Sequence, residues 1–368
     1  MSQEMLVDIQ NLTIRFGRKV VVNDLSLQVA EGERIAIVGE SGSGKTLTGL
    51  SLIGLLPEGG DVAGSVSIKI GREQTKAHDL LKLSERQLRG IRGKDVAMIF
   101  QEPMTALNPL YTVGNQIMEA VQCHEPLLSQ QECKTRAIAL LTKTGIPHPD
   151  ERFSYYPHQL SGGQRQRAMI AMALACKPRL LIADEPTTAL DPSLRLQILD
   201  LLKELQEDAK ADGGMAVILI THDLNMVRYF AQRVAVMHQG KLLECCSTEE
   251  VFERPEHPYT ESLVHSAPVR NVLPLVPIAP VLLKAQDICV DYPKAGSGFL
   301  SAGIKKFIRG LHFSDLFKRE YESVVKNISL DLRQGETLGV IGESGSGKST
   351  LAMALLDLLG QTGAKTSG

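Results

Sequence analysis

The sequence predicts an α/β fold with a mostly parallel sheet, followed by the beginning of a second copy of the same domain. Apolar runs typical of buried strands alternate with helical patterns through residues 1–265. Such alternation favours a parallel sheet covered by helices on both faces. A 32-residue stretch, Leu25–Leu56, recurs as Ile328–Leu359 with 14 identical positions. A repeat of this size indicates that one domain occurs twice.

The predicted elements of the first copy follow from residue patterns. Glu33–Gly39 (ERIAIVG) is predicted as a buried strand that runs into a glycine loop, and Lys45–Leu56 as the helix after it. Residues from about 104 to 175 are predicted to be mainly helical and to form an inserted helical subdomain. The other predicted strands are Asp95–Gln101, Arg179–Asp184 and Met215–Thr221, and Ser193–Ala209 is an amphipathic helix.

Composition divides the chain and limits its function. Residues 1–265 form the first domain, the Pro-rich stretch 266–283 is a linker, and 284–368 is the N-terminal part of the second copy. The 40 Lys and Arg against 42 Asp and Glu give a net charge of −2, which argues against a nucleic-acid partner. The six cysteines include no CxxC pair, which favours a reducing compartment.

No segment of the sequence is typical of a targeting signal or a membrane span. MSQEMLVDIQ contains charged residues and no apolar core. The longest strongly apolar stretch, Val272–Leu283, has 12 residues, three of them prolines, and a spanning helix needs about 20. Any membrane role is therefore expected to come through a partner.

The glycine loop Gly39–Thr46 reads GESGSGKT and matches the P-loop pattern GxxxxGK[ST]. In such a loop, glycines let backbone N–H groups surround phosphates and the following helix adds a partial positive charge. Lys45 is predicted to reach the terminal phosphates of a nucleotide, and the Thr46 hydroxyl to ligate Mg²⁺. The second copy repeats the loop as Gly342–Ser349.

Two carboxylates follow a predicted strand in Leu181–Glu185 (LIADE). By itself an Asp-Glu pair after a strand is often an ordinary turn, but after a P-loop it indicates phosphate chemistry. Asp184 is predicted to hold Mg²⁺ through water, and Glu185 to orient and polarise the attacking water.

With Leu160–Gln164 (LSGGQ), the sequence resembles the ABC (ATP-binding cassette) ATPases over most of 5–265 and again over 284–368. The resemblance implies a P-loop NTPase core with an antiparallel β subdomain and the inserted helical subdomain. It implies that Ser161, Gly162 and Gly163 contact the γ-phosphate of ATP held by an opposite cassette. The alternative interpretation of LSGGQ is a loop with a helix cap.

The resemblance also assigns roles to single residues. Phe16 would stack on adenine, although a strand-end core role is the alternative. Gln101 would sense Mg²⁺ and the attacking water, Asp191 would contact the other cassette, and His222 would bond the γ-phosphate. Catalytic roles thus fall to Glu185, His222 and Gln101, and metal contacts to Thr46, Gln101 and Asp184. The predicted ATP contacts are Phe16, Gly39, Glu40, Ser41, Gly42, Ser43, Gly44, Lys45, Thr46, Ser161, Gly162, Gly163, Gln164, Asp191, Gly342, Glu343, Ser344, Gly345, Ser346, Gly347, Lys348 and Ser349.

Four further stretches resemble the peptide and nickel importer ATPases in particular. They are Phe100–Pro109 (FQEPMTALNP), Tyr156–Leu160 (YPHQL), Ala183–Asp191 (ADEPTTALD) and His257–Thr260 (HPYT). Two cassettes in one chain resemble the fused ATPase of oligopeptide and microcin C importers, C-terminally truncated in the second cassette, and the fused glutathione importers. The chain departs from relatives with a Cys-rich tail after HPYT, so no iron–sulfur cluster is expected.

The resemblance implies an ATPase that powers import of peptides or peptide-like compounds. Its partners would be two transmembrane permease subunits and an extracytoplasmic solute-binding protein. It would lie peripherally on the cytoplasmic face of the inner membrane. The alternatives are a non-catalytic nucleotide-binding fragment or regulator, and a soluble, non-transport ABC ATPase.

Two cassettes are expected to close head-to-tail on two ATP, each P-loop facing the other's LSGGQ. The second copy lacks counterparts of Gln101, Ser161, Asp184, Glu185 and His222. The chain is then a fragment or truncated product, which we favour, or it homodimerises through the first copy, or it uses a partner cassette in trans. Unfinished sheet edges predict that the second copy is poorly packed.

Overall fold

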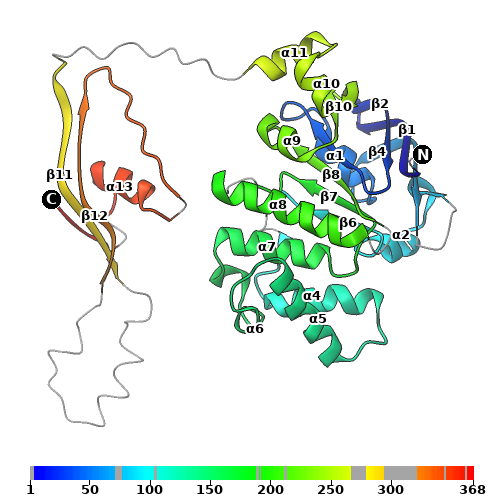
Figure 1. Cartoon of the computed structure of the whole chain (residues 1–368), viewed down its shortest axis with the longest axis horizontal. Helices are drawn as coiled ribbons and strands as arrows, with labels where there is room; N and C mark the ends of the chain where they lie inside the picture. The colour runs from blue at the N-terminus through cyan, green and yellow to red at the C-terminus, as the bar shows by residue number, and fades with distance from the viewer. Residues whose placement is uncertain are drawn as a thin grey trace. The chain divides into compact units, whose positions relative to one another are not determined.

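The computed structural model describes residues 4–70, 77–102, 106–187, 190, 192–210, 214–266, 279–293, 321–343, 345–360 and 363–368, with only the backbone of Pro192 and Ser193. The chain divides into two compact units, Met1–Pro268 and Val269–Gly368 (Figure 1). Each unit is described by itself below.

Unit 1 is organised around a six-stranded sheet with the order β10-β9-β3-β8-β7-β6. All neighbours are parallel except the β9–β10 pair. Every residue of β7 and β8 is buried, as expected for parallel strands covered on both faces. The strands are β3 (Arg34–Val38), β6 (Val96–Ile99), β7 (Leu180–Asp184), β8 (Ala216–Thr221), β9 (Arg233–His238) and β10 (Lys241–Ser247).

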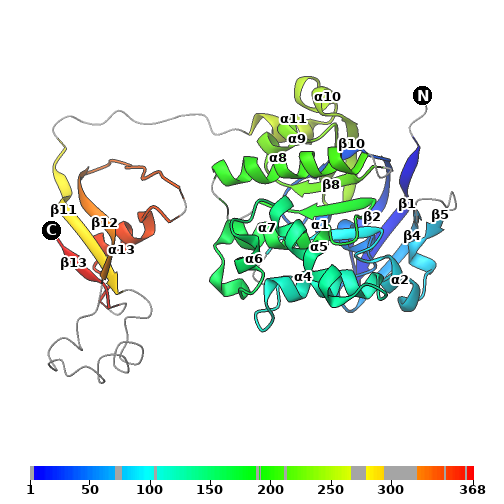
Figure 2. The same cartoon turned by 60° about the horizontal axis from the view of Figure 1, so that its bottom comes forward.

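The two faces of this sheet contribute to two hydrophobic cores. Alternate residues of β7 separate cleanly: Leu180 and Ile182 join the first core, Leu181 and Ala183 the second. The first core is shared with an antiparallel sheet of order β2-β1-β4-β5, and the second with helices α7, α8 and α9. Figure 2 shows α8 and α9 along one side of the parallel strands. The antiparallel strands are β1 (Met5–Phe16), β2 (Lys19–Ala30), β4 (Gly60–Lys69) and β5 (Ala77–Asp79).

The helical subdomain has a core of its own, which includes Val113, Ile117, Leu141 and Phe153. Three of its helices, α4, α5 and α7, start with a side-chain cap, such as the capping box of Ser129 with Glu132, which satisfies N–H groups at a helix start. Its elements are α4 (Val113–His124), α5 (Gln130–Lys143), α6 (Pro149–Arg152), η2 (Pro157–Gln159) and α7 (Gly162–Ala173). The remaining helices in the described part of unit 1 are α1 (Lys45–Ser51), η1 (Leu80–Lys82), α2 (Glu85–Ile91), α8 (Pro192–Ala209), α9 (Leu224–Phe230), α10 (Thr248–Glu253) and α11 (Pro258–His265).

The helix after the P-loop is shorter than the sequence predicted, because α1 ends at Ser51 and not at Leu56. Gly54 adopts a left-handed φ of 61°, and the N–H of Leu55 bonds back to the carbonyl of Leu50. This Schellman arrangement stops a helix at a glycine. The apolar pattern extends past this stop, which explains the overestimate.

Unit 2 repeats the first hairpin and the P-loop helix around a small core of Val290, Val325, Leu351 and Leu359. Its strands form a sheet of order β12-β11-β13. β11 begins at Val281, inside the expected linker 266–283, while residues 267–278 lie outside the described part. The elements are β11 (Val281–Pro293), β12 (Tyr321–Arg333), α13 (Lys348–Leu355) and β13 (Lys365–Ser367).

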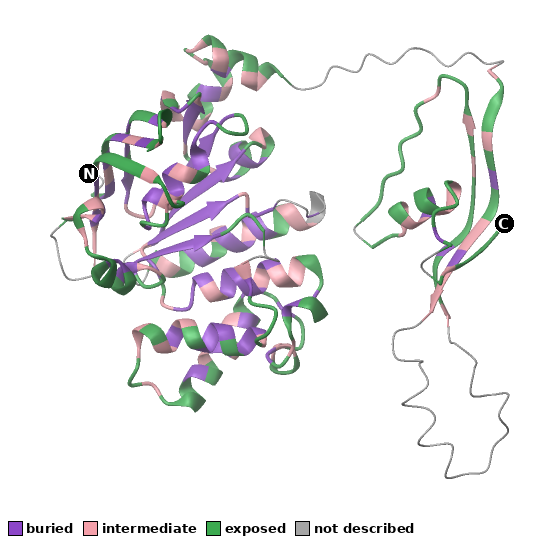
Figure 3. Cartoon of the chain, turned by 180° about the vertical axis from the view of Figure 1, so that it is seen from behind, coloured by how far each residue is buried: buried purple, intermediate pink, exposed green. Residues whose placement is uncertain are grey.

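The segment of unit 2 that corresponds to β3 is not a strand. In unit 1, β3 lies between β8 and β9, whereas the described part of unit 2 offers no such neighbours. Leu338, Val340 and Ile341 are consequently 44%, 50% and 94% exposed. Figure 3 shows the contrast between the buried strands of unit 1 and the mostly exposed ribbon of unit 2. Similar apolar segments thus form a buried strand in unit 1 and a solvent-exposed segment in unit 2, because among the described residues only the first has neighbouring strands to pair with.

Truncating one isoleucine in each unit should distinguish a buried core strand from a solvent-exposed segment. Ile37 of β3 is fully buried, so Ile37→Ala should lower the free energy of unfolding of unit 1 by about 2–5 kcal/mol. Ile341→Ala should change it by less than about 0.5 kcal/mol. Urea denaturation with separate probes for the two units measures both. Equal effects of the two substitutions would contradict the described packing.

Candidate active site

The P-loop connects β3 to α1, and its backbone requires glycine at particular positions. Gly42 and Gly44 have φ values of 80° and 100°, a region that favours glycine. Gly39 has φ of 150°, and a Cβ there would lie 2.0 Å from the carbonyl oxygen of Met237. The loop therefore fits tightly against the end of β9.

Lys45 closes the loop by bonding two of its carbonyl groups. Its Nζ donates to the carbonyl oxygens of Gly39 (2.8 Å) and Glu40 (2.7 Å), and the residue is buried. Burial lowers the pKa of the Lys45 ammonium, an effect opposed by the carboxylates of Glu185 and Asp184. A buried cation surrounded by loop amides is suited to binding phosphate.

Asp184 ends β7 next to the first turn of α1. The Thr46 hydroxyl donates to Asp184 Oδ1 at 3.3 Å, so the two residues predicted to bind metal lie side by side. Asp184 is 2% exposed. Burial and the neighbouring Glu185 carboxylate raise the pKa of Asp184 to about 6, against the lowering effects of Thr46 and Lys45. A buried carboxylate of this kind gains from an added cation.

Glu185 is the meeting point of the other predicted catalytic residues. Gln101 Nε2 donates to Glu185 Oε2 at 3.2 Å, and His222 Nδ1 lies 2.8 Å from Glu185 Oε1. Glu185 has a left-handed φ of 45°, and its N–H donates to the carbonyl of Ile220. Gln101, Glu185 and His222 follow β6, β7 and β8, so the carboxyl ends of parallel strands place them at one edge of the sheet.

The LSGGQ segment forms the start of α7, away from this cluster. Ser161 caps the helix: its hydroxyl accepts the N–H of Gln164 at 3.3 Å, and Gln164 Oε1 accepts the N–H of Ser161 at 3.2 Å. Ser161 and Gly162 are exposed. In this chain Ser161 therefore acts as a helix cap. The start of α7 is exposed, so another molecule can reach it.

Phe16 ends β1 and packs against the first core as a partly buried ring. A Cβ on its strand partner Gly60 would lie 3.1 Å from the ring. The core role of Phe16 is thus evident, and adenine stacking stays a prediction. Asp191 and Ser344, also predicted to contact ATP, lie outside the described residues.

The second P-loop repeats the internal bonds of the first. Lys348 Nζ donates to Gly342 (2.8 Å) and Glu343 (2.6 Å) carbonyls, although the segment before the loop is not a strand. Local sequence therefore sets the loop shape. In the described part of unit 2, no residues correspond to Asp184 and Glu185.

One contact with the P-loop was missed by sequence analysis. The N–H of Glu40 donates to the hydroxyl of Tyr259 at 3.2 Å, across 219 positions of sequence. HPYT resembles a family motif, but no local pattern indicates which loop a helix so far along the chain contacts.

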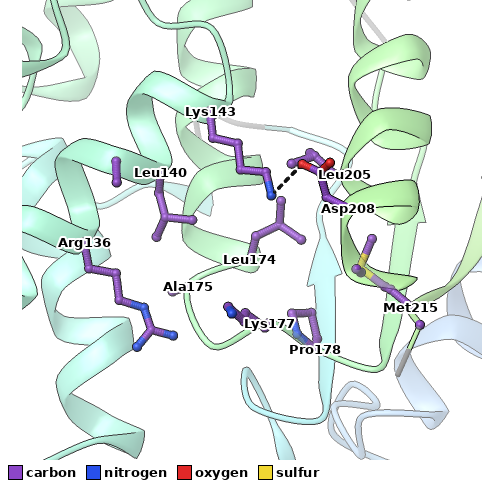
Figure 4. Close-up of a pocket in the computed structure, with 13 residues that line it drawn as sticks. Arg136, Leu140, Lys143, Leu174, Ala175, Lys177, Pro178, Leu205, Asp208 and Met215 are labelled. Atoms are coloured by element: carbon purple, nitrogen blue, oxygen red, sulfur yellow. Dashed lines mark ion pairs between the residues drawn. The ribbon is translucent and has the colours of Figure 1, made fainter. Parts of the chain in front are cut away.

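A cavity of about 450 Å³ lies between the helical subdomain and the core of unit 1, and Figure 4 shows its lining. Lys143 of α5 and Asp208 of α8 form an ion pair there at 2.9 Å. Leu140, Leu174 and Leu205 supply apolar walls. None of the residues predicted to bind nucleotide lines this cavity. Among the described residues, moreover, no helix is both long and apolar enough to cross a bilayer.

One edge of the sheet carries a P-loop, a buried aspartate and a Gln–Glu–His cluster. The helical subdomain contains a helix that starts with LSGGQ. Together these features define an ATP-binding cassette. The family model described as ABC transporter matches residues 22–188 and 325–366. The chain belongs to the ABC transporter family.

Among curated relatives, the uncharacterized ABC transporter ATP-binding protein YejF of Escherichia coli K12 is 44% identical over 99% of this chain and 64% of its own length. The peptidoglycan transport ATP-binding protein YejF of Agrobacterium fabrum is 42% identical over 98% and 62%. The glutathione import ATP-binding protein GsiA of Salmonella typhimurium is 44% identical over 96% and 58%. The chain spans about six tenths of the length of these relatives.

Solved structures agree on the fold. A dimeric structure of the ATP-binding cassette MJ0796 in a post-hydrolysis state with ADP and Pi has a TM-score of 0.56 and 29% identity, covering 66% of this chain and 99% of that one. CbiO1 from Clostridium perfringens has a TM-score of 0.56 and 27% identity over 72% and 97%. The α/β P-loop NTPase fold predicted from the sequence is confirmed.

The raised pKa of Asp184 gives a pH-dependent prediction. The folded state prefers the protonated carboxyl, so this contribution to stability is present below pH 3.8 and is lost as pH rises through about 6. Asp184→Asn should therefore stabilise the nucleotide-free and metal-free protein by roughly 1–3 kcal/mol above pH 7 and by little at pH 4. Thermal unfolding across pH tests this, with Asp61→Asn, exposed at the start of β4, as the control. An effect independent of pH would contradict the assignment.

Proposed function

We propose that the chain binds and hydrolyses ATP to power a membrane importer for peptides or peptide-like compounds. Residues 1–265 would be the first cassette and 284–368 part of a second. The convergence of Gln101 and His222 on Glu185, beside Lys45 and the Thr46–Asp184 pair, carries the proposal. This arrangement provides an anion site and a positioned carboxylate at the same edge of one sheet.

Phosphate binding would rest on the P-loop. Its amides and the α1 N-terminus would face the phosphates, and Lys45 would exchange its bonds to Gly39 and Glu40 for phosphate oxygens. Because Lys45 already lies within the loop, only its hydrogen-bond partners would need to change, and a preorganised cation favours anion binding.

Magnesium fits the residues beside the loop. A hydroxyl oxygen and a carboxylate oxygen 3.3 Å apart are the oxygen donors that Mg²⁺ prefers, and Asp184 is buried with a raised pKa. Thr46 and Asp184 would hold the ion, with Gln101 nearby. When bound, it would supply charge neutralisation on the phosphates.

Glu185 would act as the base that orients the attacking water. Gln101 and His222 contact opposite oxygens of its carboxylate, which fixes the direction of the group. The N–H of Glu185, whose φ is left-handed, also bonds the carbonyl of Ile220, which ties its backbone to the end of β8. These residues therefore hold a proton acceptor at a defined place.

A complete site would need a second cassette, supplied in cis by a longer chain or in trans. The exposed LSGGQ start of α7 is available for this purpose, and the MJ0796 cassette is described as dimeric. Two relatives are named for peptidoglycan transport and glutathione import; the shared peptide character of these compounds supports the substrate class proposed.

The permease subunits would bind the helical subdomain from the cytoplasmic face of the inner membrane, and a solute-binding protein would act on the other side. Leu110 and Tyr111 are 79% and 56% exposed, beside a groove of about 640 Å³ lined by Asn108, Asn115 and Met118 among others. Exposed apolar side chains next to a groove are typical of an interaction site.

The first experiment measures ATP hydrolysis against protein concentration, with Glu185→Gln. The variant should lose at least about 100-fold in rate while its affinity for ATP stays within about threefold of the wild type. Glu204→Gln, an exposed position on α8, is the control and should keep full activity. A specific rate that rises with concentration would indicate homodimerisation. If the protein binds ATP but shows no turnover even after a partner cassette is added, the result would favour the alternative function, a non-catalytic nucleotide-binding regulator.

A charge placed in the apolar patch tests the importer against a soluble ATPase. Leu110→Asp should prevent co-purification of two transmembrane subunits from membranes and leave basal ATP hydrolysis within about twofold, because it buries an unpaired charge at the contact. Leu127→Asp, at a residue 98% exposed on the same subdomain, should have neither effect. Absence of transmembrane subunits from the wild-type preparation would contradict the importer.

A further inference from the structure

The first peptide group of the P-loop is held at both of its polar atoms. Its carbonyl, from Gly39, accepts from Lys45 Nζ at 2.8 Å. Its N–H, from Glu40, donates to the Tyr259 hydroxyl at 3.2 Å. One bond comes from the loop itself and the other from α11, the last described helix of unit 1.

Tyr259 is well fixed. Its ring packs on the His238 ring with 4.0 Å between centroids and joins the second core. The start of α11 is capped by His257, whose Nδ1 accepts the N–H of Tyr259 at 3.0 Å. Glu244 of β10 accepts the N–H groups of Glu256 and His257. These contacts therefore fix the position of the Tyr259 hydroxyl relative to the P-loop.

The same part of the sheet supports the P-loop at two more points. The N–H of Gly240, in the β9–β10 turn, donates to the carbonyl of Ser43 at 3.2 Å. Gly39 lies against the Met237 carbonyl with no room for a Cβ. The P-loop is thus supported by β9, by the β9–β10 turn and by α11. Within this support, Tyr259 of α11 bonds the first peptide of the loop through its side chain.

Nucleotide binding changes the balance of these bonds. Phosphates would draw Lys45 away from the Gly39 carbonyl, and the Tyr259 hydroxyl would remain on the other side of the same peptide. Without the bond to Tyr259 the peptide plane would rotate more easily, and such a rotation would redirect the amides that follow. Because anion binding depends on amide direction, the orientation of this peptide affects affinity.

We propose that Tyr259 is a positioning residue that holds the Gly39–Glu40 peptide in its phosphate-binding orientation and thereby raises affinity for nucleotide without touching it. The inference rests on the proposed ATP binding. The second P-loop offers an internal comparison: Lys348 makes the equivalent bond to Gly342, but the described part of unit 2 contains no counterpart of α11. The lysine bond thus follows from local sequence, whereas the tyrosine bond requires the distant helix.

The test removes only the hydroxyl. Tyr259→Phe keeps the ring on His238, and its Kd and KM for ATP should rise about three- to tenfold, the loss expected for one hydrogen bond, with kcat within about twofold. Tyr229→Phe is the matched control, because the Tyr229 hydroxyl bonds Asp200 on α8, away from the loop. Binding is measured in the Glu185→Gln background, so hydrolysis does not interfere.

Amide hydrogen exchange supplies a second readout. The Glu40 amide should exchange faster in Tyr259→Phe than in the wild type or in Tyr229→Phe, with an unchanged melting temperature. Unchanged affinity and unchanged exchange would overturn the inference, as would a loss of kcat alone. A lowered melting temperature with no selective change at Glu40 would also overturn it. If the wild type binds no ATP, the proposed function is wrong. The exchange measurement would still test whether the Tyr259 hydroxyl bonds the Glu40 amide of the loop.

Discussion

The parallel pairing of β6, β7, β8 and β3 is the constraint on which the rest of unit 1 depends. Parallel strands end at a common edge, so short turns after them meet in space although they are far apart in sequence. Thr46, Gln101, Asp184, Glu185 and His222 reach one small region for this reason. Burial of the strands on both faces makes the edge rigid, and a rigid edge is what a site of charged groups needs in order to stay aligned.

Much of this arrangement could be predicted because its signals are local. Continuous apolar runs identified β3, β7 and β8, and the loop motif identified Lys45 and Thr46 together with the sense of the chain around them. Asp184 was predicted from its place after an apolar run that follows the P-loop, whereas the role of His222 came from the resemblance to the ABC ATPases. The end of α1 was predicted less well, since a glycine in a left-handed conformation interrupts an apolar pattern that continues beyond it.

What escaped prediction depends on partners distant in sequence. The segment around Val340 has the composition of β3 and yet is not a strand, because strand formation requires neighbours that supply hydrogen bonds. The bond between Tyr259 and Glu40 is likewise set by how α11 rests on β9 and β10. Phe16 stands between the two cases: a strand-end core role was predicted as the alternative to adenine stacking, whereas the side chains that its ring packs against are set by the tertiary fold.

The capping box at the start of α7 has a consequence for assembly. Ser161 uses an oxygen lone pair to accept the N–H of Gln164, which restricts its side chain to one rotamer. The hydroxyl proton is left to donate elsewhere. A serine ordered in advance would lose little further conformational entropy on binding an anion, and the ordering of side chains is one of the costs of association. The cap that begins the helix would thus also lower the entropic cost of the proposed contact with a second cassette.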